Sequence, residues 1–285
     1  MKRTVSFLYL ILAALTRFSH PALAQGGPPF RSDDPDTPGN KNWEINIVFV
    51  GDRNPSEGSY ETPNIDLNYG LGNRIQLKYE VPLSIQESRD SPGHVISGLG
   101  NSLLGVKWRL YSHHPRTNAP GQAVKKESNF AISIYPQLLL NNPTSSVRRG
   151  IVESGPQFLM PVEANARIGP MRISGEIGYW FTNKDVSSSW IRGVIVGHEF
   201  RQKTELFLEI YDQEATSAFG DKPKARESTV GIGSRIPIAR DGSVWFIGMV
   251  GRSLVTVTRT NDQPSWIASL GLQILSGRRR RYSSD

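Results

Sequence analysis

Hydrophobic and polar residues alternate along most of this chain with a period of two. Between Trp43 and Phe49, and again between Ile75 and Ile85, apolar side chains take every second position and polar side chains take most of the others. This period is typical of strands with one apolar and one polar face. Similar segments recur as far as residue 274. We count about twelve strands when two segments of ambiguous phase, 189–200 and 243–253, are included.

No segment has the period of an amphipathic helix, so no helical layer can cover a sheet of this size. The sheet must pack as a sandwich or close on itself. Sandwich strands are commonly about 5–6 residues long, whereas a tilted membrane strand needs about 9–11, and the runs here are of the longer kind. We therefore predict an all-β fold, a closed antiparallel transmembrane β-barrel of about twelve strands over residues 43–275.

The predicted connections alternate between long and short ones. An even number of strands brings the first and last strands back to the same side of the membrane. Outer-membrane barrels also combine short periplasmic turns with long extracellular loops. Segment 112–128 departs from this rule, because it is long and falls on the periplasmic side; we interpret it as an insertion. The long links otherwise lie at about 51–61, 87–101, 142–154, 183–188, 213–226 and 258–264, and the short ones at Gly70–Asn73, Ile168–Gly169, Arg201–Lys203 and Asp241–Gly242.

Turn chemistry predicts the register of two hairpins. A turn centred on Gly72 places Asp66 opposite Lys78, so that opposite charges meet across the hairpin. A two-residue type I′ turn at Asp241-Gly242 is expected to direct alternate residues of the next strand outward, namely Trp245, Ile247 and Met249.

Aromatic residues gather near both ends of the predicted strands. We interpret them as the two girdles that lie in the headgroup regions of outer-membrane barrels. Cross-strand packing, as in any sheet, is the alternative. The candidates are Trp43, Tyr69, Trp108 and Trp245 at the periplasmic end and Tyr179, Trp190 and Trp266 at the outer end.

The polar face of the strands carries acidic and basic residues in nearly equal number. Charges inside a low-dielectric wall need partners or water, so the near balance predicts a narrow, wet passage rather than a strongly ion-selective pore. A plugged barrel, whose charges only bond to one another, is the alternative. The candidate lumen-lining residues are Glu44, Asp66, Lys78, Glu80, Lys107, Arg109, Glu163, Arg172, Glu176, Glu205, Glu209 and Arg235.

The two ends of the chain differ from its middle. Residues 1–24 have a short basic start, an apolar stretch from Val5 to Leu15 and a small-residue site at Ala22–Ala24, which together predict a cleaved signal peptide. Residues 25–42 are rich in Pro and Asp and are expected to form a periplasmic lead-in without regular structure. Residues 276–285 form a basic C-terminal tail.

The formal charge of +7 lies mostly at these ends. Three basic residues belong to the leader and four form the run Arg278–Arg281; the remaining 26 basic residues equal the 26 acidic ones. The body of the protein is therefore close to neutral, which argues against nucleic-acid binding.

Searches for catalytic or metal-binding patterns yield little, and we expect no catalytic residue, no cofactor and no metal. The chain has no Cys, which excludes disulfides and Cys-ligated metals. The neighbouring His113 and His114 point apart on an extended chain. Asx turns explain Asp33-Asp34-Pro35-Asp36 as well as calcium binding does. His198 beside Glu199 could act as a general base in a barrel-embedded lipid hydrolase, but no partner Ser can be assigned.

Two stretches resemble a known family. The segment Leu67-Asn-Tyr-Gly-Leu-Gly-Asn-Arg-Ile-Gln-Leu-Lys78, followed by Gly98-Leu-Gly-Asn-Ser-Leu-Leu-Gly-Val-Lys-Trp-Arg-Leu110, is similar to the outer-membrane family named after the meta-pathway of phenol degradation. The match covers residues 43–110 and is only general beyond them. It implies an outer-membrane barrel that transports small, often hydrophobic compounds, with no established catalytic residues. Asn101 stands where the family often has Asp, and the chain lacks the terminal aromatic residue usual in outer-membrane strands.

These observations predict an outer-membrane channel or transporter for small solutes, including hydrophobic or aromatic ones, in a Gram-negative bacterium. Its expected partners are outer-membrane lipid and a small-molecule solute, with no nucleic acid; the sequence does not indicate an oligomeric state. The lipid hydrolase and a non-conducting structural or adhesive barrel are the alternatives from other functional classes.

Overall fold

A computed structural model describes residues 27, 29–88, 94–113, 129–182, 187–200, 204–217, 224–257 and 263–276. The predicted signal peptide, His114 and the Arg278–Arg281 run lie outside these residues, so these expectations stay predictions.

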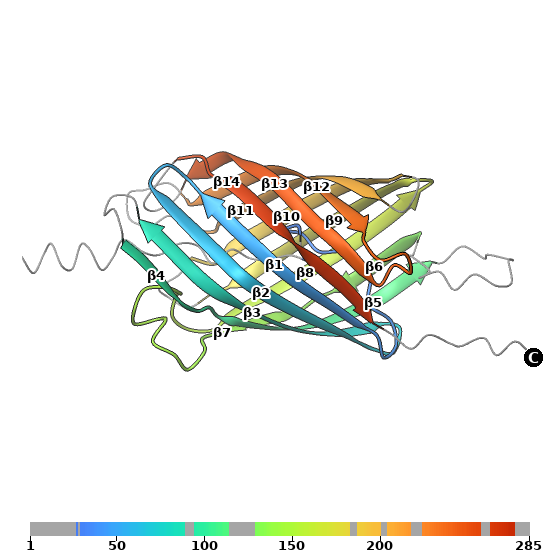
Figure 1. Ribbon diagram of the computed structural model, residues 1–285, viewed down its shortest axis with the longest axis horizontal. Helices are drawn as coiled ribbons and strands as arrows, with labels where there is room; N and C mark the ends of the chain where they lie inside the picture. Colours follow the sequence, from blue (N-terminus) through green and yellow to red (C-terminus); the bar gives the residue numbers. More distant parts are fainter. Residues whose placement is uncertain are drawn as a thin grey trace, which may run out of the picture.

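The described chain folds into one antiparallel sheet that closes into a barrel of twelve strands (Figure 1). Ten of them are continuous. Each of the other two is broken into a pair of segments, β4 with β5 and β6 with β7. The elements are β1 (Trp43–Arg53), β2 (Glu57–Leu71), β3 (Ile75–Ser88), β4 (His94–Leu99), β5 (Ser102–His113), β6 (Phe130–Ile134), β7 (Gln137–Leu140), β8 (Gln157–Ile168), β9 (Met171–Phe181), β10 (Ser189–Glu199), β11 (Glu205–Ala215), β12 (Arg226–Pro237), β13 (Val244–Val257) and β14 (Trp266–Ser276).

Pairing of the first and last strands closes the barrel. β1 runs antiparallel to β14 in unbroken register from Trp43 opposite Ser276 to Arg53 opposite Trp266. Closure removes the exposed sheet edges that lipid could not satisfy with hydrogen bonds. The break between β6 and β7 falls at Tyr135-Pro136, where proline lacks the N–H that a continuous ladder would use.

Burial in the barrel is inverted relative to a soluble protein. Asn46, Asp66 and Glu163 are almost completely buried. In contrast, Ile47, Leu77 and Val194, on the other face of the sheet, are exposed. Polar side chains therefore fill the interior and apolar side chains cover the outside, as expected where lipid surrounds the wall.

The ends of the barrel carry connections of different length. At the end that holds Trp43 and Ser276, Gly72 and Gly169 adopt positive φ angles of 71° and 60° in tight turns, a conformation that glycine reaches without strain. The opposite end carries the longer links 141–156 and 216–225. The link predicted at 51–61 is short instead, because β1 and β2 extend to Arg53 and Glu57.

The predicted register of the first hairpin is wrong by two residues. Leu71 pairs with Ile75, so Asp66 lies opposite Glu80 and Lys78 lies opposite Asn68. A shift of two keeps every side chain on its predicted face. The predicted charge pair still forms, diagonally, with Lys78 Nζ 3.5 Å from Asp66 Oδ1.

The predicted phase of β13 is also wrong. The link before it spans residues 238–243 rather than two residues, and Trp245 pairs with Pro237. This shift turns the strand over, so Trp245, Ile247 and Met249 point inward and are buried. Trp245 is therefore not a girdle residue; its indole N–H donates to the carbonyl of Gly242 at 2.8 Å.

The other girdle candidates lie on the outer surface near the strand ends. Trp43 packs against Tyr69 with ring centroids 4.7 Å apart, and Tyr179 packs against Trp190 at 4.9 Å. Trp108, Trp190 and Trp266 are exposed. No helix within the described residues is long and apolar enough to cross a bilayer.

Because the outer face of the barrel is apolar, we expect a charged side chain placed on it to destabilise the barrel more at the centre of a strand than at its end. Val194 lies at the centre of β10 and Leu71 lies at the end of β2, and both are exposed. We expect Val194→Arg to destabilise the membrane-inserted barrel by about 2–4 kcal/mol and Leu71→Arg by about 0–1 kcal/mol. Urea titration of liposome-inserted protein, followed by heat-modifiable gel migration, measures both. Equal effects would contradict a lipid-facing wall.

Candidate functional site

The interior of the barrel gathers the residues that the sequence pattern assigned to the lumen. Most are buried, while Glu44, Arg172 and Arg235 are half-buried. The fully buried members are Asp66, Lys78, Glu80, Lys107, Arg109, Glu163, Glu176, Glu205 and Glu209. They divide into networks on different parts of the wall.

One network lies on β1, β2 and β3 around Lys78. Its ammonium group is 2.8 Å from Glu80 and 3.5 Å from Asp66. The amides of Asn46 and Asn68 each donate to Asp66 at 3.0 Å. These hydrogen bonds compensate for taking the charges out of water.

A second network surrounds Lys107 on β5. Its ammonium group lies 3.2 Å from Glu163 on β8 and 2.9 Å from Asp33, and stands 4.5 Å from the ring centroid of Tyr135. The hydroxyl of Ser133 donates to Glu163 at 2.6 Å. Lys107 therefore joins the wall to a residue that precedes the first strand.

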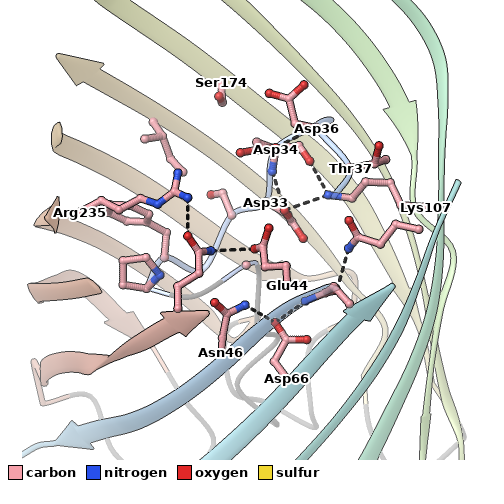
Figure 2. A pocket seen from close by; sticks show the side chains of 18 of the residues that line it. Asp33, Asp34, Asp36, Thr37, Glu44, Asn46, Asp66, Lys107, Ser174 and Arg235 are labelled. Carbon is pink, nitrogen blue, oxygen red and sulfur yellow. Dashed lines mark hydrogen bonds and ion pairs between the residues drawn. The ribbon is translucent and has the colours of Figure 1, made fainter. Parts of the chain in front are cut away.

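Residues 29–38, hereafter the plug segment, lie inside the barrel rather than in the periplasm, where the sequence had suggested a lead-in. Figure 2 shows Asp33 and Asp34 in the middle of the interior, with Lys107 reaching toward them from the wall. Proline and the lack of an amphipathic period predicted irregular backbone correctly, but backbone of that kind can also be buried when wall side chains satisfy its polar groups.

Wall cations hold the acidic part of the plug segment. Asp36 lies 3.3 Å from Arg109 on β5 and 3.4 Å from Arg172 on β9. Arg172 also pairs with Asp34. The three carboxylates of the segment therefore engage three cations, Lys107 and Arg109 from β5 and Arg172 from β9.

Wall carboxylates in turn accept hydrogen bonds from the plug backbone. Glu209 on β11 accepts from the N–H groups of Ser32 at 2.8 Å and Arg31 at 3.3 Å, and Glu176 on β9 accepts from the N–H of Asp33 at 3.1 Å. Such charge-assisted bonds are stronger than neutral ones.

Arg31 fastens the other end of the segment to β12. Its guanidinium group lies 3.1 Å from Glu227 and 5.2 Å from the ring centroid of Tyr211. Burial lowers the pKa of Arg31, but Glu227, Tyr211 and Asp52 together outweigh burial and raise that pKa above its usual value. Arg31 therefore stays charged.

Beside the Glu209 and Glu227 contacts, the wall from β10 to β14 also has an apolar region where the plug segment meets it. Phe30 packs in a buried cluster with Ile195, Phe207, Met249 and Ile267, and its ring centroid lies 5.2 Å from that of Phe207. The interior thus combines ionic networks with one apolar cluster.

Glycines in the wall make room for the plug segment. A Cβ atom on Gly193 would lie 1.8 Å from the hydroxyl oxygen of Ser32, and one on Gly233 would lie 2.9 Å from the ring of Phe30. Both positions face inward on strands, where glycine often marks a close approach of another backbone. This was the sequence signal that could have located the plug segment.

A polar cavity of about 100 Å³ remains beside the plug segment. Figure 2 shows Glu44, Asn46 and Asp66 on one side of it and Arg235 on another. Gln273 links two of these groups, because it donates to Glu44 at 2.8 Å and accepts from Arg235. Pockets that hold drug-sized ligands measure about 300–1,000 Å³, so this cavity is too small for such a ligand.

The other chemical candidates form no site. His198 lies next to Phe200, with ring centroids 4.5 Å apart, and its buried Nδ1 atom makes no hydrogen bond within the described residues. The described residues also contain no acidic or histidine cluster suited to a metal ion.

Comparisons with known proteins relate this fold to outer-membrane barrels. No family model and no curated protein sequence matches the chain, so the resemblance of residues 43–110 to the phenol-degradation family stays a prediction.

Solved structures do match. The COG4313 outer membrane channel from Pseudomonas putida F1 has a TM-score of 0.65 and 13% identity, over 85% of this chain and 98% of that chain. The NanC porin has a TM-score of 0.54 and 6% identity, over 81% of this chain and 98% of its own. The translocator domain of the autotransporter NalP from Neisseria meningitidis has a TM-score of 0.52 and 7% identity, over 96% and 97%. At these identities the comparisons show a shared outer-membrane β-barrel fold.

The buried position of Lys107 predicts a large effect of its removal. Lys107→Met leaves Glu163 and Asp33 without their cation, so we expect the barrel to lose about 3–5 kcal/mol of stability, measured by urea titration. Lys107→Met/Glu163→Gln should recover part of this loss. Lys41→Met, at an exposed lysine beyond the barrel end, is the control. A loss of less than about 1 kcal/mol would contradict the network.

Proposed function

We propose that this protein is a channel for small solutes in the outer membrane of a Gram-negative bacterium, and that its own plug segment closes the lumen in the described state. The observation that carries the proposal is an enclosed polar interior inside a wall whose outer face is apolar. A polar lumen of this kind offers water-soluble groups a route through hydrocarbon. The similarity in fold to a channel and a porin supports it.

The orientation follows from the barrel ends. Outer-membrane barrels keep short turns in the periplasm and longer loops outside. We therefore place the turns at Gly72 and Gly169 in the periplasm, and links 141–156 and 216–225 at the cell surface. Export by a cleaved signal peptide at residues 1–24 is part of the proposal.

The plug segment has the properties of a removable closure. Most of its contacts are ion pairs and hydrogen bonds, which water can replace, whereas a permanent core would bury mainly apolar surface. It is anchored to β1 through residues at the barrel end, where the N–H of Lys41 donates to the carbonyl of Gly70 at 2.8 Å. Displacement would occur toward the periplasm, around this anchor.

The interior offers a solute both charged and apolar contacts, and this combination suggests the class of solute. Lys107, Arg109 and Arg172 offer charge on one side, and the cluster around Phe207 offers an apolar surface on the other. Small solutes with both a polar group and an apolar or aromatic part would be complementary to this lining. The family resemblance of residues 43–110 points in the same direction.

Neutralising the plug carboxylates should open the channel. We expect Asp33→Asn/Asp34→Asn/Asp36→Asn to raise mean conductance in planar bilayers at least about fivefold, because each lost ion pair removes roughly 1 kcal/mol or more of anchoring. Asp241→Asn, in a periplasmic turn, is the control. No current from any variant, including one that lacks residues 29–37, would rule out the channel itself.

A steric change should have the same effect without altering charge. The methyl group of Gly193→Ala would collide with Ser32 and displace the plug segment, so conductance should rise. Gly175→Ala, at the outward face of β9 where the nearest atom lies 3.8 Å away, should leave conductance unchanged. Heat-modifiable migration of both variants verifies folding. Equal conductance in the two variants would contradict closure by the plug segment.

A further inference from the structure

The outer surface of the barrel carries one ionic cluster where the surrounding strands present apolar side chains to lipid. Arg192 points outward from β10 with two carboxylate neighbours on β11, Asp212 at 3.1 Å and Glu214 at 3.4 Å. Arg226 on β12 shares Asp212, with its Nε atom 2.9 Å away. The interior networks account for none of these residues.

Aromatic side chains border this cluster on its β9 side. Tyr179 packs edge-on against Trp190 at 4.9 Å and against Phe181 at 4.7 Å, measured between ring centroids. Trp190 lies opposite Tyr179 on one side and opposite Glu214 on the other, so the aromatic and ionic groups are direct neighbours. We call these seven residues the outer patch: Tyr179, Phe181, Trp190, Arg192, Asp212, Glu214 and Arg226.

The outer patch lies at the barrel end opposite Trp43 and Ser276. Arg192 is two residues nearer the barrel centre than Trp190, and the next outward residue, Val194, is apolar. A charged side chain facing lipid costs about 0–1 kcal/mol near the interface and more at greater depth. Arg192 therefore lies between the strand end at Trp190 and the apolar centre of β10, where a polar partner lowers the cost of its charge.

The two guanidinium groups differ in their hydrogen bonds. Arg192 donates from Nη1 to Asp212 and Glu214 and from Nη2 to Glu214, so it has less remaining donor capacity than Arg226. Their side chains are 48% and 47% exposed, for Arg192 and Arg226 respectively. Arg226 uses only Nε toward Asp212, and its two terminal nitrogens make no hydrogen bond within the described residues. The carboxylates hold both groups in place, which lowers the entropy cost of binding a further ligand.

We propose that the outer patch binds a phosphorylated glycolipid of the outer leaflet, with phosphate on the terminal nitrogens of Arg226 and the remaining Nη2 hydrogen of Arg192, and the sugar and first acyl carbons against Trp190 and Phe181. The planar guanidinium group of arginine matches the geometry of phosphate. Amphipathic aromatic side chains favour the headgroup region. Asp212 and Glu214 orient the guanidinium groups and leave the outer patch nearly neutral, so binding depends on geometry more than on net charge.

A second cation supports an outer-leaflet location. Arg252 on β13 stands over the ring of Trp266 at 4.7 Å, on the same outward surface and at the same end of the barrel. Arg53 of β1 lies opposite Trp266. Arginine beside tryptophan thus recurs around this rim.

The test measures glycolipid retained by the full mature protein after detergent exchange and gel filtration, by mass spectrometry. The probe is purified diphosphorylated lipid A, with dephosphorylated lipid A in parallel. We expect Arg192→Gln/Arg226→Gln to reduce retention of the phosphorylated form at least about tenfold. Lys41→Gln/Arg74→Gln, which removes two charges at the other barrel end, should retain as much as the unmodified protein.

Three outcomes would overturn the proposal. Equal retention by the two double variants would remove the role of the arginines, and undiminished retention of dephosphorylated lipid A would remove the role of phosphate. A change of oligomeric state in Arg192→Gln/Arg226→Gln without loss of lipid would assign the outer patch to contact with a second copy. Heat-modifiable migration confirms that each variant is folded, and none of these readouts depends on conductance.

Discussion

The need to pair every backbone N–H and C=O within lipid determines this structure. Only closure of β1 onto β14 leaves the sheet without an edge, and closure separates each strand into an inward and an outward face. The alternation of side chains then assigns polar residues to the interior and apolar residues to the lipid. Ion networks, plug segment and outer patch all take their positions from this division.

Much of the fold was predictable because the period of two is local information. The outward residues of β1, such as Ile47, and the inward charges, such as Glu163, follow directly from it. Register was less predictable, because it depends on turn length. Trp245 pairs with Pro237 across a longer link than predicted, and this one-residue shift in the pairing reversed Trp245. In the first hairpin a two-residue shift preserved the faces and even the contact of Lys78 with Asp66.

The plug segment could not be found from periodicity. Its residues have no regular structure, and its position depends on contacts between positions far apart in sequence, such as Arg31 with Glu227 and Asp36 with Arg109. The charges of the wall were visible in the sequence, but their partners were not. The inward glycines at positions 193 and 233 were the local sequence feature that indicated a close approach of another chain segment. Only the structure shows that this segment contains Ser32 and Phe30.

The acidity of the plug segment has a consequence for permeation. Asp33, Asp34 and Asp36 occupy the cations Lys107, Arg109 and Arg172 while the lumen is closed. Once the segment withdraws, these three groups face the vacated space without the three Asp carboxylates, and Lys107 keeps its pair with Glu163. The conducting form would then attract anions along that flank, so the same contact that closes the pathway also conceals its ionic preference.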